Sequence, residues 1–178
     1  MDERVNDDQF RLAMRSLAGA VNIVATAHSG HRYGMTATAV CSATADPPSV
    51  LVCLNRVTST HGAVVKSGIF CVNVLRFEDY EWSTAFAGGQ AGEARFKARD
   101  WTHLATGAPV LSDALASFDC RVVKTLEHGT HTIFLGEVES ILIGKKGKPL
   151  IYAAGQYAKL ASLAHGEALP EGLDYWGF

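Results

Sequence analysis

The chain has 178 residues, 48% of them apolar, and a formal net charge of −2 at neutral pH. This length fits one domain with a sizeable core. The near balance of charge argues against a nucleic-acid or membrane-surface partner recruited by charge. No apolar run approaches the roughly 18 residues of a membrane span, so none is expected.

The N-terminal stretch MDERVNDDQF is acidic and lacks the apolar segment of a signal peptide. The cysteines at positions 41, 53, 71 and 120 are scattered, without C-x-x-C spacing. Free thiols without an export signal predict a cytoplasmic protein.

The first predicted element is a helix that begins at Asn6, where Gln9 completes a capping box. Phe10, Met14 and Leu17 fall on one face of this helix, and Gly19 is expected to end it.

The remaining pattern is rich in strands. Strands are expected over residues 20–28, 33–40, 50–54, 69–75, 116–126, 130–143 and 150–153, with a short segment over 101–104. A short helix is expected from Ser59 or Thr60 to about residue 66, and an irregular helical stretch over 78–100 with a break at Gly88 and Gly89. Strands without β-α-β alternation favour a mainly β fold with peripheral helices, an antiparallel barrel.

We expect a single domain over residues 1–178, with a core of about 8–162 and a polar tail over 163–178. The tail ends in Tyr175, Trp176 and Phe178, which either dock on a partner subunit or belong to a disordered end.

The segment from Gly34 to Thr60 is the strongest candidate for a binding site. It opens with a run of small residues, whose candidate contacts are Thr36, Ala37, Thr38, Ala39, Val40, Cys41 and Ser42. Small side chains allow a flat ligand to lie against backbone N–H and C=O groups; the alternative is a tightly packed hairpin strand.

Asn55, Arg56, Ser59 and Thr60 follow the next buried strand. A guanidinium, two hydroxyls and a helix N-terminus can together hold a phosphate, although a charged residue after a strand is also typical of a solvated strand end. A flat ring with a phosphate tail suggests a flavin.

Further candidates lie later in the chain. His131 follows a glycine turn and could contact a carboxamide or phosphate, or serve as a structural hydrogen-bonding group. Arg95 and Phe96 could form a flap over a ligand or a helix end, and Tyr152 and Tyr157 could be rim or core aromatics.

Several motifs are missing. The sequence has neither G-x-G-x-x-G nor G-x-x-x-x-G-K-[ST], which excludes the Rossmann fingerprint and the P-loop. The pairs His28 with His31 and His128 with His131 have H-x-x-H spacing but no evident third ligand, so no metal site is predicted.

Taken in order, the strings GMTATAVCSATADPP, LVCLNRVTST, FCVNVL, GTHTIFLGEV and LIYAAGQY resemble the short-chain flavin reductase family. The resemblance is closest to the NADH-dependent reductase components of two-component aromatic monooxygenases, and the flavin reductases of uracil-degradation monooxygenases form a sibling branch. It covers roughly residues 10–160.

The resemblance implies a split β-barrel of the Greek-key, FMN-binding type that forms a homodimer. It implies FAD, or alternatively FMN, and NADH as cofactors, and a separate oxygenase that receives reduced flavin to hydroxylate a phenolic compound. Residues 36–42 would line the flavin ring, and Asn55, Arg56, Ser59 and Thr60 would hold its phosphate.

The same resemblance places His131 near the nicotinamide, with Arg95, Phe96, Tyr152 and Tyr157 around it or around the outer edge of the flavin. Two positions depart from the family pattern: Thr130, where relatives often have Asp, and Gln156, where a basic residue is frequent. Two other classes stay open: a flavin- or haem-binding split-barrel protein without turnover, and an oxidase that uses no NADH.

Overall fold

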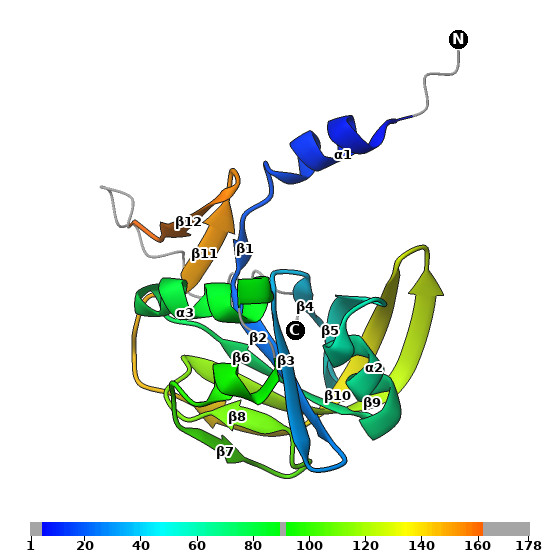
Figure 1. Ribbon diagram of the computed structural model, residues 1–178, viewed down its shortest axis with the longest axis vertical. Coiled ribbons are helices and arrows are strands. Elements are labelled where there is room, and N and C mark those ends of the chain that lie inside the picture. The colour runs from blue at the N-terminus through cyan, green and yellow to red at the C-terminus, as the bar shows by residue number, and fades with distance from the viewer. Residues whose placement is uncertain (1–4, 90–91, 162–178) are drawn as a thin grey trace.

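The computed structural model describes residues 5–89 and 92–161, which form three sheets with short helices around them (Figure 1). The strands are β1 (Gly19–Ala20), β2 (Asn22–His28), β3 (His31–Ala37), β4 (Val40–Ala45), β5 (Pro48–Asn55), β6 (Ile69–Val74), β7 (Trp101–His103), β8 (Pro109–Leu111), β9 (Ala116–His128), β10 (His131–Ile143), β11 (Leu150–Ala153) and β12 (Gln156–Lys159). The helices are α1 (Asp7–Met14), α2 (Ser59–Ser67) and α3 (Tyr80–Thr84), and the short turns are η1 (Phe77–Asp79), η2 (Ala85–Gly89) and η3 (Gly92–Phe96).

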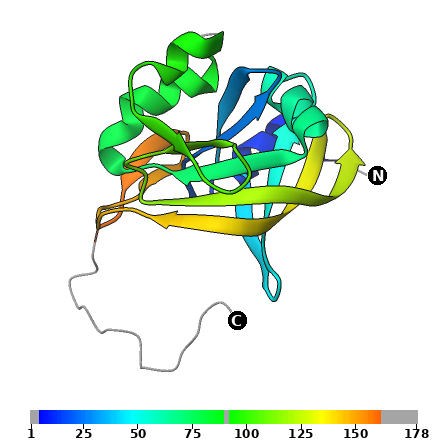
Figure 2. The same cartoon turned by 90° about the horizontal axis from the view of Figure 1, so that it is seen from below.

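The main sheet has seven strands in the order β3-β2-β6-β9-β10-β5-β4, and every neighbouring pair is antiparallel. Its two edge strands, β3 and β4, are separated in the chain by Thr38 and Ala39 alone, so the sheet must curl until these edges meet at one corner. The long β9–β10 hairpin runs across the breadth of the molecule (Figure 2). The mainly β class with peripheral helices is confirmed. No ladder of hydrogen bonds joins β3 to β4 among the described strands.

Strand β2 lies between two hydrophobic clusters. Val24 packs into a cluster with Val52, Phe70 and Phe134, whereas its neighbour Ile23 packs into another that contains Phe86, Phe96 and Leu150. Consecutive side chains of a strand point to opposite faces. β2 therefore needs apolar residues on both faces, which the consecutive residues Ile23, Val24 and Ala25 supply.

A buried asparagine joins the β7–β8 hairpin to the main sheet. The side chain of Asn73 on β6 is 0% exposed. Its Nδ2 donates to the carbonyl oxygens of Ile23 and Pro109 at 3.2 and 3.3 Å, and its Oδ1 accepts from Leu111 N and Ser117 Oγ at 2.8 and 2.9 Å. Because both polar atoms have hydrogen-bond partners, these bonds offset the cost of removing the amide from water.

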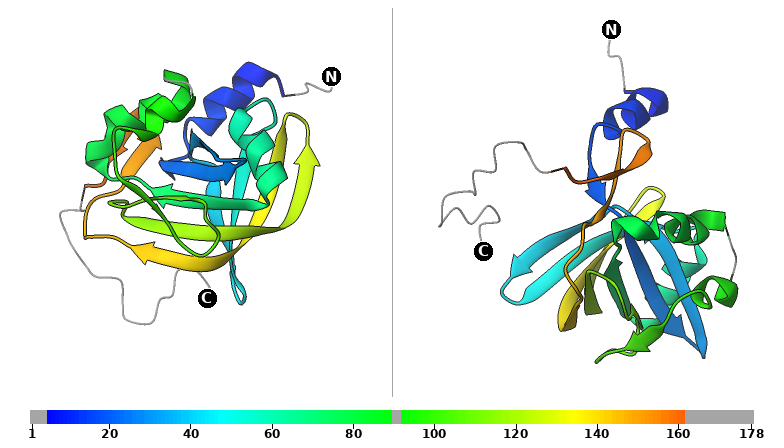
Figure 3. Two further views of the ribbon diagram at one scale, coloured as in Figure 1. Left: turned by 60° about the horizontal axis from the view of Figure 1, so that its bottom comes forward. Right: turned by 90° about the vertical axis from the view of Figure 1, so that its left-hand side faces the viewer.

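The predicted start of the first helix is confirmed. Asn6 Oδ1 accepts from Gln9 N at 2.8 Å, and Gln9 Oε1 accepts from Asn6 N at 3.1 Å. The predicted end is wrong, because α1 stops at Met14. The helix stands off the main sheet on the same side as the β11–β12 hairpin (Figure 3), so Phe10 and its apolar neighbours are exposed.

Other element predictions are corrected at turns. The single strand expected over 33–40 is divided between β3 and β4, since the chain leaves one sheet edge after Ala37 and enters the other at Val40. Helix α2 is capped by Thr58, one residue before the predicted cap, whose Oγ1 accepts from His61 N at 3.2 Å. β12 was not expected. The irregular helical stretch and the β9–β10 hairpin are confirmed, and Gly88 has a φ of +118°.

The predicted tail over 163–178, with its terminal aromatic residues, lies outside the described residues. Within residues 5–89 and 92–161, none of the helices has the length and apolar character needed to cross a membrane.

Two glycines with opposite surroundings test this packing. A Cβ on Gly136 of β10 would clash with Phe70 Cζ, whereas one on Gly62 of α2 would meet nothing within 4 Å. Gly136→Ala should therefore lower the free energy of unfolding by about 1–3 kcal/mol through overpacking. Gly62→Ala should raise it by about 0.4–1 kcal/mol, since alanine restricts the unfolded chain and favours the helix. Urea unfolding of both variants measures this, and equal effects of the two changes would contradict the packing described.

Candidate functional site

A groove of about 610 Å³ lies among the end of β3, the start of α2, the η2 turn and the β11–β12 hairpin. Eight of the residues predicted from the sequence line it: Thr36, Ala37, Thr38, Ser59, Thr60, Arg95, Tyr152 and Tyr157. Its volume falls within the range of about 300–1,000 Å³ that is typical of small-molecule sites. Its other lining residues are Val21, Gly34, Met35, Thr58, Phe86, Ala87 and Gly88.

The free edge of β3 faces this groove. Arg32 N donates to Glu93 Oε1 at 2.8 Å, and Gly34 O accepts from Arg95 Nη1 at 2.8 Å, so both groups point away from β2. Because backbone groups of an edge strand point alternately toward and away from its neighbour, the N–H and C=O of Thr36 point off the same edge. Thr36 Oγ1 donates to Ser83 O at 2.6 Å, which fixes its side chain against α3. The strand thus presents main-chain donors and acceptors to a ligand.

The N-terminus of α2 forms the second wall. Ser59 and Thr60 open the helix and line the groove. The first N–H groups of a helix have no partner within the helix, and they lie at the positive end of its dipole. Two hydroxyls and this helix end can together hold an anionic group.

Arg95 supplies a positive charge beside the β3 edge. Besides its bond to Gly34 O, its Nε donates to Gly92 O at 3.1 Å, and its guanidinium lies 5.5 Å from the centre of the Phe86 ring. Burial lowers the pKa of Arg95, but an arginine remains charged at neutral pH. The two backbone contacts hold this charge in one place.

Two tyrosines face each other on the β11–β12 hairpin. Tyr152 and Tyr157 are partners across the strands, with ring centres 5.6 Å apart in an edge-to-face arrangement. The Tyr157 hydroxyl lies 2.8 Å from Ser83 Oγ, so its ring is anchored, while Tyr152 is more exposed. An exposed aromatic face at the rim of a groove can stack on a flat ligand.

Four residues of the small-residue run lie outside the groove. Ala39 belongs to the connection between the strands, and Val40, Cys41 and Ser42 belong to β4, none of which lines it. The run crosses from one sheet edge to the other, so its first half alone faces the groove.

The predicted phosphate clamp is also divided. Asn55 Oδ1 accepts from Val57 N at 3.1 Å within its own turn, and Arg56 Nη2 lies 3.4 Å from Glu127 Oε2 on the neighbouring hairpin. Neither residue lines the groove, although Ser59 and Thr60 do. The physical reason is that the end of β5 lies beside the tip of β9–β10, where Glu127 attracts the guanidinium.

The structure corrects the role expected for Phe96. Its side chain is 1% exposed, with ring centres 5.2 Å from Phe86 and 4.9 Å from Trp101. It packs beneath β3 rather than over a ligand. A Cβ on Gly34 would lie 2.9 Å from Phe86 and 3.2 Å from Phe96, so the glycine lets this aromatic cluster approach the strand.

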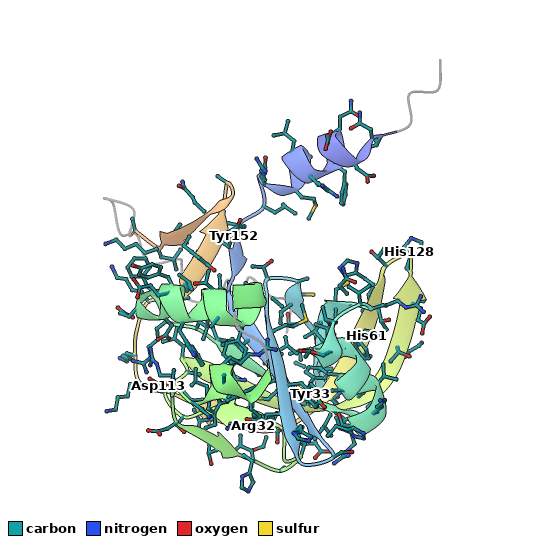
Figure 4. All side chains as sticks on the ribbon, in the orientation of Figure 1. Arg32, Tyr33, His61, Asp113, His128 and Tyr152 are labelled. Atoms are coloured by element: carbon teal, nitrogen blue, oxygen red, sulfur yellow. The ribbon has the colours of Figure 1, made fainter. Side chains whose placement is uncertain are left out.

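His131 stands at the tip of the β9–β10 hairpin. Its cross-strand partners are His128 on one side and Asn55 on the other, and its Nδ1 lies 2.8 Å from Thr130 Oγ1. Figure 4 shows His128 at this tip, on the other side of the molecule from Tyr152. His131 is exposed and does not line the groove of its own chain.

No motif or spacing in the sequence indicates a role for His61. This side chain in the first turn of α2 is 8% exposed, and its Nε2 lies 2.9 Å from Thr132 Oγ1 on β10. Burial and then the charge of Arg56 lower the pKa of His61, while Glu127 acts in the opposite direction. His61 therefore fixes the start of α2 to the sheet in its neutral form. Among the described residues, no group of three His, Cys, Asp or Glu side chains is placed to hold a metal.

The groove combines a free strand edge, a helix N-terminus and a fixed arginine, which are contacts that a flat, phosphate-bearing ligand can use. The model of the flavin reductase-like domain family matches residues 14–161. The chain therefore belongs to the flavin reductase-like domain family, and it is an oxidoreductase of the flavin reductase type.

Relatives and solved structures agree with this family. The chain is 45% identical over 156 residues to the FMN reductase (NADH) RutF of Variovorax paradoxus. The aligned region covers 88% of this chain and 87% of that protein. Flavin reductase PheA2 is 33% identical with a TM-score of 0.81, over 89% of this chain and 100% of that one. BorF, the flavin reductase component of a bacterial two-component tryptophan halogenase, is 28% identical with a TM-score of 0.81, over 89% of this chain and 100% of its own.

The contact of His61 leads to a pH prediction. A histidine whose pKa is lowered by folding contributes its full stability above its unfolded value of about 6.5 and loses it as the pH falls through that value toward the folded pKa. The difference in the free energy of unfolding between the wild type and His61→Gln should therefore become smaller as the pH falls from about 7.5 to about 5.5. Chemical unfolding at several pH values measures it, with His103→Gln on β7 as the matched control. A difference that stays constant over this range would contradict a neutral, buried His61.

Proposed function

We propose that the protein is an NADH-dependent flavin reductase that binds FMN in the groove, uses it as an exchangeable substrate and releases reduced flavin to a separate oxygenase. The observation that carries the proposal is the free edge of β3 beside the N-terminus of α2. These two elements offer the two kinds of contact that a flavin needs, along its ring and at its phosphate.

The flavin ring fits the first of these elements. The pyrimidine edge of the ring presents an acceptor, a donor and an acceptor side by side. The N–H and C=O of Thr36 lie on a strand edge that can form hydrogen bonds with these groups. Ala37 and Thr38 are small enough for the ring to approach the main chain. A bound flavin supplies the redox chemistry, accepting hydride from NADH at its N5 atom.

The charges around the groove favour a reduced flavin. The N–H groups of β3 and α2 and the Arg95 guanidinium are held by the fold before any ligand arrives. Fixed donors of this kind stabilise negative charge with little reorganisation. The ring contacts are mostly main-chain, which suits a ligand that must leave again after each turnover.

The choice of flavin and oxygenase rests on relatives. FMN is supported by the RutF proteins, which are named FMN reductases (NADH). Identities of 45% and 43% to two RutF proteins, against 33% for PheA2, favour a uracil-degradation oxygenase as the partner. FAD with a phenol-hydroxylating oxygenase, expected from the sequence resemblance, is the second candidate.

A homodimer is part of the proposal. The exposed apolar residues Phe10 and Met14 of α1, and Leu17 just after it, border a hollow of about 500 Å³. This hollow shares Thr38 and Tyr152 with the flavin groove, so a second copy that covered the face would also close one side of the groove. His131, which is outside the groove of its own chain, is proposed to act on the nicotinamide in this assembly.

Turnover with NADH or NADPH against FMN, FAD and riboflavin tests the function. We expect NADH oxidation that rises with added free flavin and saturates, fastest with FMN. Stoichiometric flavin or haem binding without turnover would favour the non-catalytic class. Oxygen uptake driven by a small substrate without NADH would favour an oxidase.

Thr38→Leu tests whether a bulky side chain beside the strand edge blocks the ring. The added volume should raise the KM for flavin by about tenfold or more, the effect of losing roughly 1.4 kcal/mol of binding. Ala43→Leu, on exposed β4 in the same small-residue run, is the control and should leave the KM unchanged. An equal effect of the two variants would place the ring elsewhere.

His131→Ala tests the histidine at the hairpin tip. Losing a hydrogen bond to the nicotinamide should raise the KM for NADH about threefold to tenfold, as for one bond of about 0.5–1.5 kcal/mol, and should leave flavin affinity unchanged. His128→Ala, its cross-strand partner, is the control and should behave as wild type. Unchanged kinetics in His131→Ala would remove this residue from the site.

A further inference from the structure

Buried polar contacts fix both ends of α2 to the main sheet. At the C-terminal end, Ser67 Oγ lies 2.9 Å from Oγ1 of the buried Thr26 on β2. At the N-terminal end, His61 Nε2 lies 2.9 Å from Oγ1 of the buried Thr132 on β10 (Figure 4). Ser67 is about 12 Å along the helix axis from Ser59, which lines the groove. The His61 contact therefore lies beside the groove, and the Ser67 contact lies away from it.

The first turn of α2 has hydrogen-bonding groups left for a ligand. Thr60 is 2% exposed and lines the groove, and within the described part of the chain no hydrogen bond joins its hydroxyl to another residue. The N–H groups of Ser59 and Thr60 have no acceptor within the helix. His61 N, in contrast, donates to the capping hydroxyl of Thr58 at 3.2 Å. Residues 59 and 60 therefore present the groups that an anion can use.

These groups are neutral donors, so their position is important. Arg56, just before α2, has its Nη2 3.4 Å from Glu127 Oε2 and does not line the groove. Hydrogen bonds from N–H groups and hydroxyls weaken steeply when their distance or angle changes. A phosphate held by the first turn is therefore sensitive to small movements of that turn.

His61 restrains such movement. Besides its contact with Thr132, its ring lies edge-to-face against Phe134, with ring centres 5.4 Å apart. Burial lowers the pKa of His61, and the neutral ring can share a hydrogen bond with a hydroxyl without burying a charge. Loss of this bond would free the first turn from β10, while the contact of Thr26 with Ser67 would still hold the other end of the helix.

We propose that His61 is a positioning residue for the flavin phosphate, and that its contact with Thr132 makes the protein prefer FMN to riboflavin. This inference rests on the proposed function, because it requires the phosphate of the flavin to meet the start of α2. Riboflavin has the same ring and no phosphate, so its binding depends on β3 rather than on the first turn of the helix. His61 thus selects between two flavins through the groups beside it.

His61→Leu in the full chain is the test, because it keeps an apolar side chain and removes the ring nitrogens. Calorimetry should show FMN affinity falling by about threefold to tenfold, the effect of one hydrogen bond, and riboflavin affinity unchanged. In turnover, the KM for FMN should rise by the same factor while kcat at saturating FMN stays constant. His61→Gln keeps a side-chain amide that can reach the hydroxyl, so it should restore most of the preference.

Two threonine variants separate positioning from general stability. Thr132→Val removes the partner hydroxyl and should act like His61→Leu, and the double variant should be no weaker than either alone. Thr26→Val is the matched control, because it breaks the contact at the C-terminal end of α2. It should lower the free energy of unfolding and leave the ratio of FMN to riboflavin affinity at the wild-type value.

An unchanged ratio in folded Thr132→Val, or an equal fall in Thr26→Val, would overturn the inference. If the wild type did not oxidise NADH while its FMN preference depended on His61, the proposed function alone would fail. NADH oxidation with a ratio that no variant changes would reject the role of His61 and leave the proposed function standing. If His61→Leu does not fold, Thr132→Val decides by the same measurements.

Discussion

The free edge of β3 is the constraint on which the site depends. The strand pairs with β2 on one side, while on the other its backbone meets side chains and the groove instead of another strand. Glu93 accepts from Arg32 N and Arg95 donates to Gly34 O, while the N–H and C=O of Thr36 face the groove. Gly34 has no side chain, so Phe86 packs directly beneath and supports the strand. An edge held in this way stays open to a ligand without being flexible.

Few side chains in the groove carry charge, which suits the proposed recognition of the flavin by the main chain. Bulk would hinder a ring that must approach an edge strand, and the residues at positions 36–38 are small. The charged contributions come from the periphery, from Arg95 and from the start of α2, which His61 fixes to β10. In the proposed complex this arrangement would place charge beside the ligand's polar groups and leave its flat face to Tyr152.

Local patterns in the sequence predicted much of the fold and eight of the fifteen residues that line the candidate groove. The capping box at Asn6, the glycine turn before β10 and the hydroxyls at the start of α2 each depend on neighbours in the chain. Phe96, Arg56 and His131 were misplaced or left outside the groove because their surroundings are set by distant segments. An aromatic cluster buries Phe96, Glu127 draws Arg56 away, and the length of β10 carries His131 to a hairpin tip. Periodicity contains no information about such contacts.

Amide hydrogen exchange with and without FMN tests the central claim most directly, because it reports on individual backbone N–H groups. The account predicts that flavin slows exchange at Thr36 and along residues 34–38, with a second protected region at residues 59 and 60. Protection confined to β4 or to the tip of β9–β10, with residues 34–38 unchanged, would contradict it.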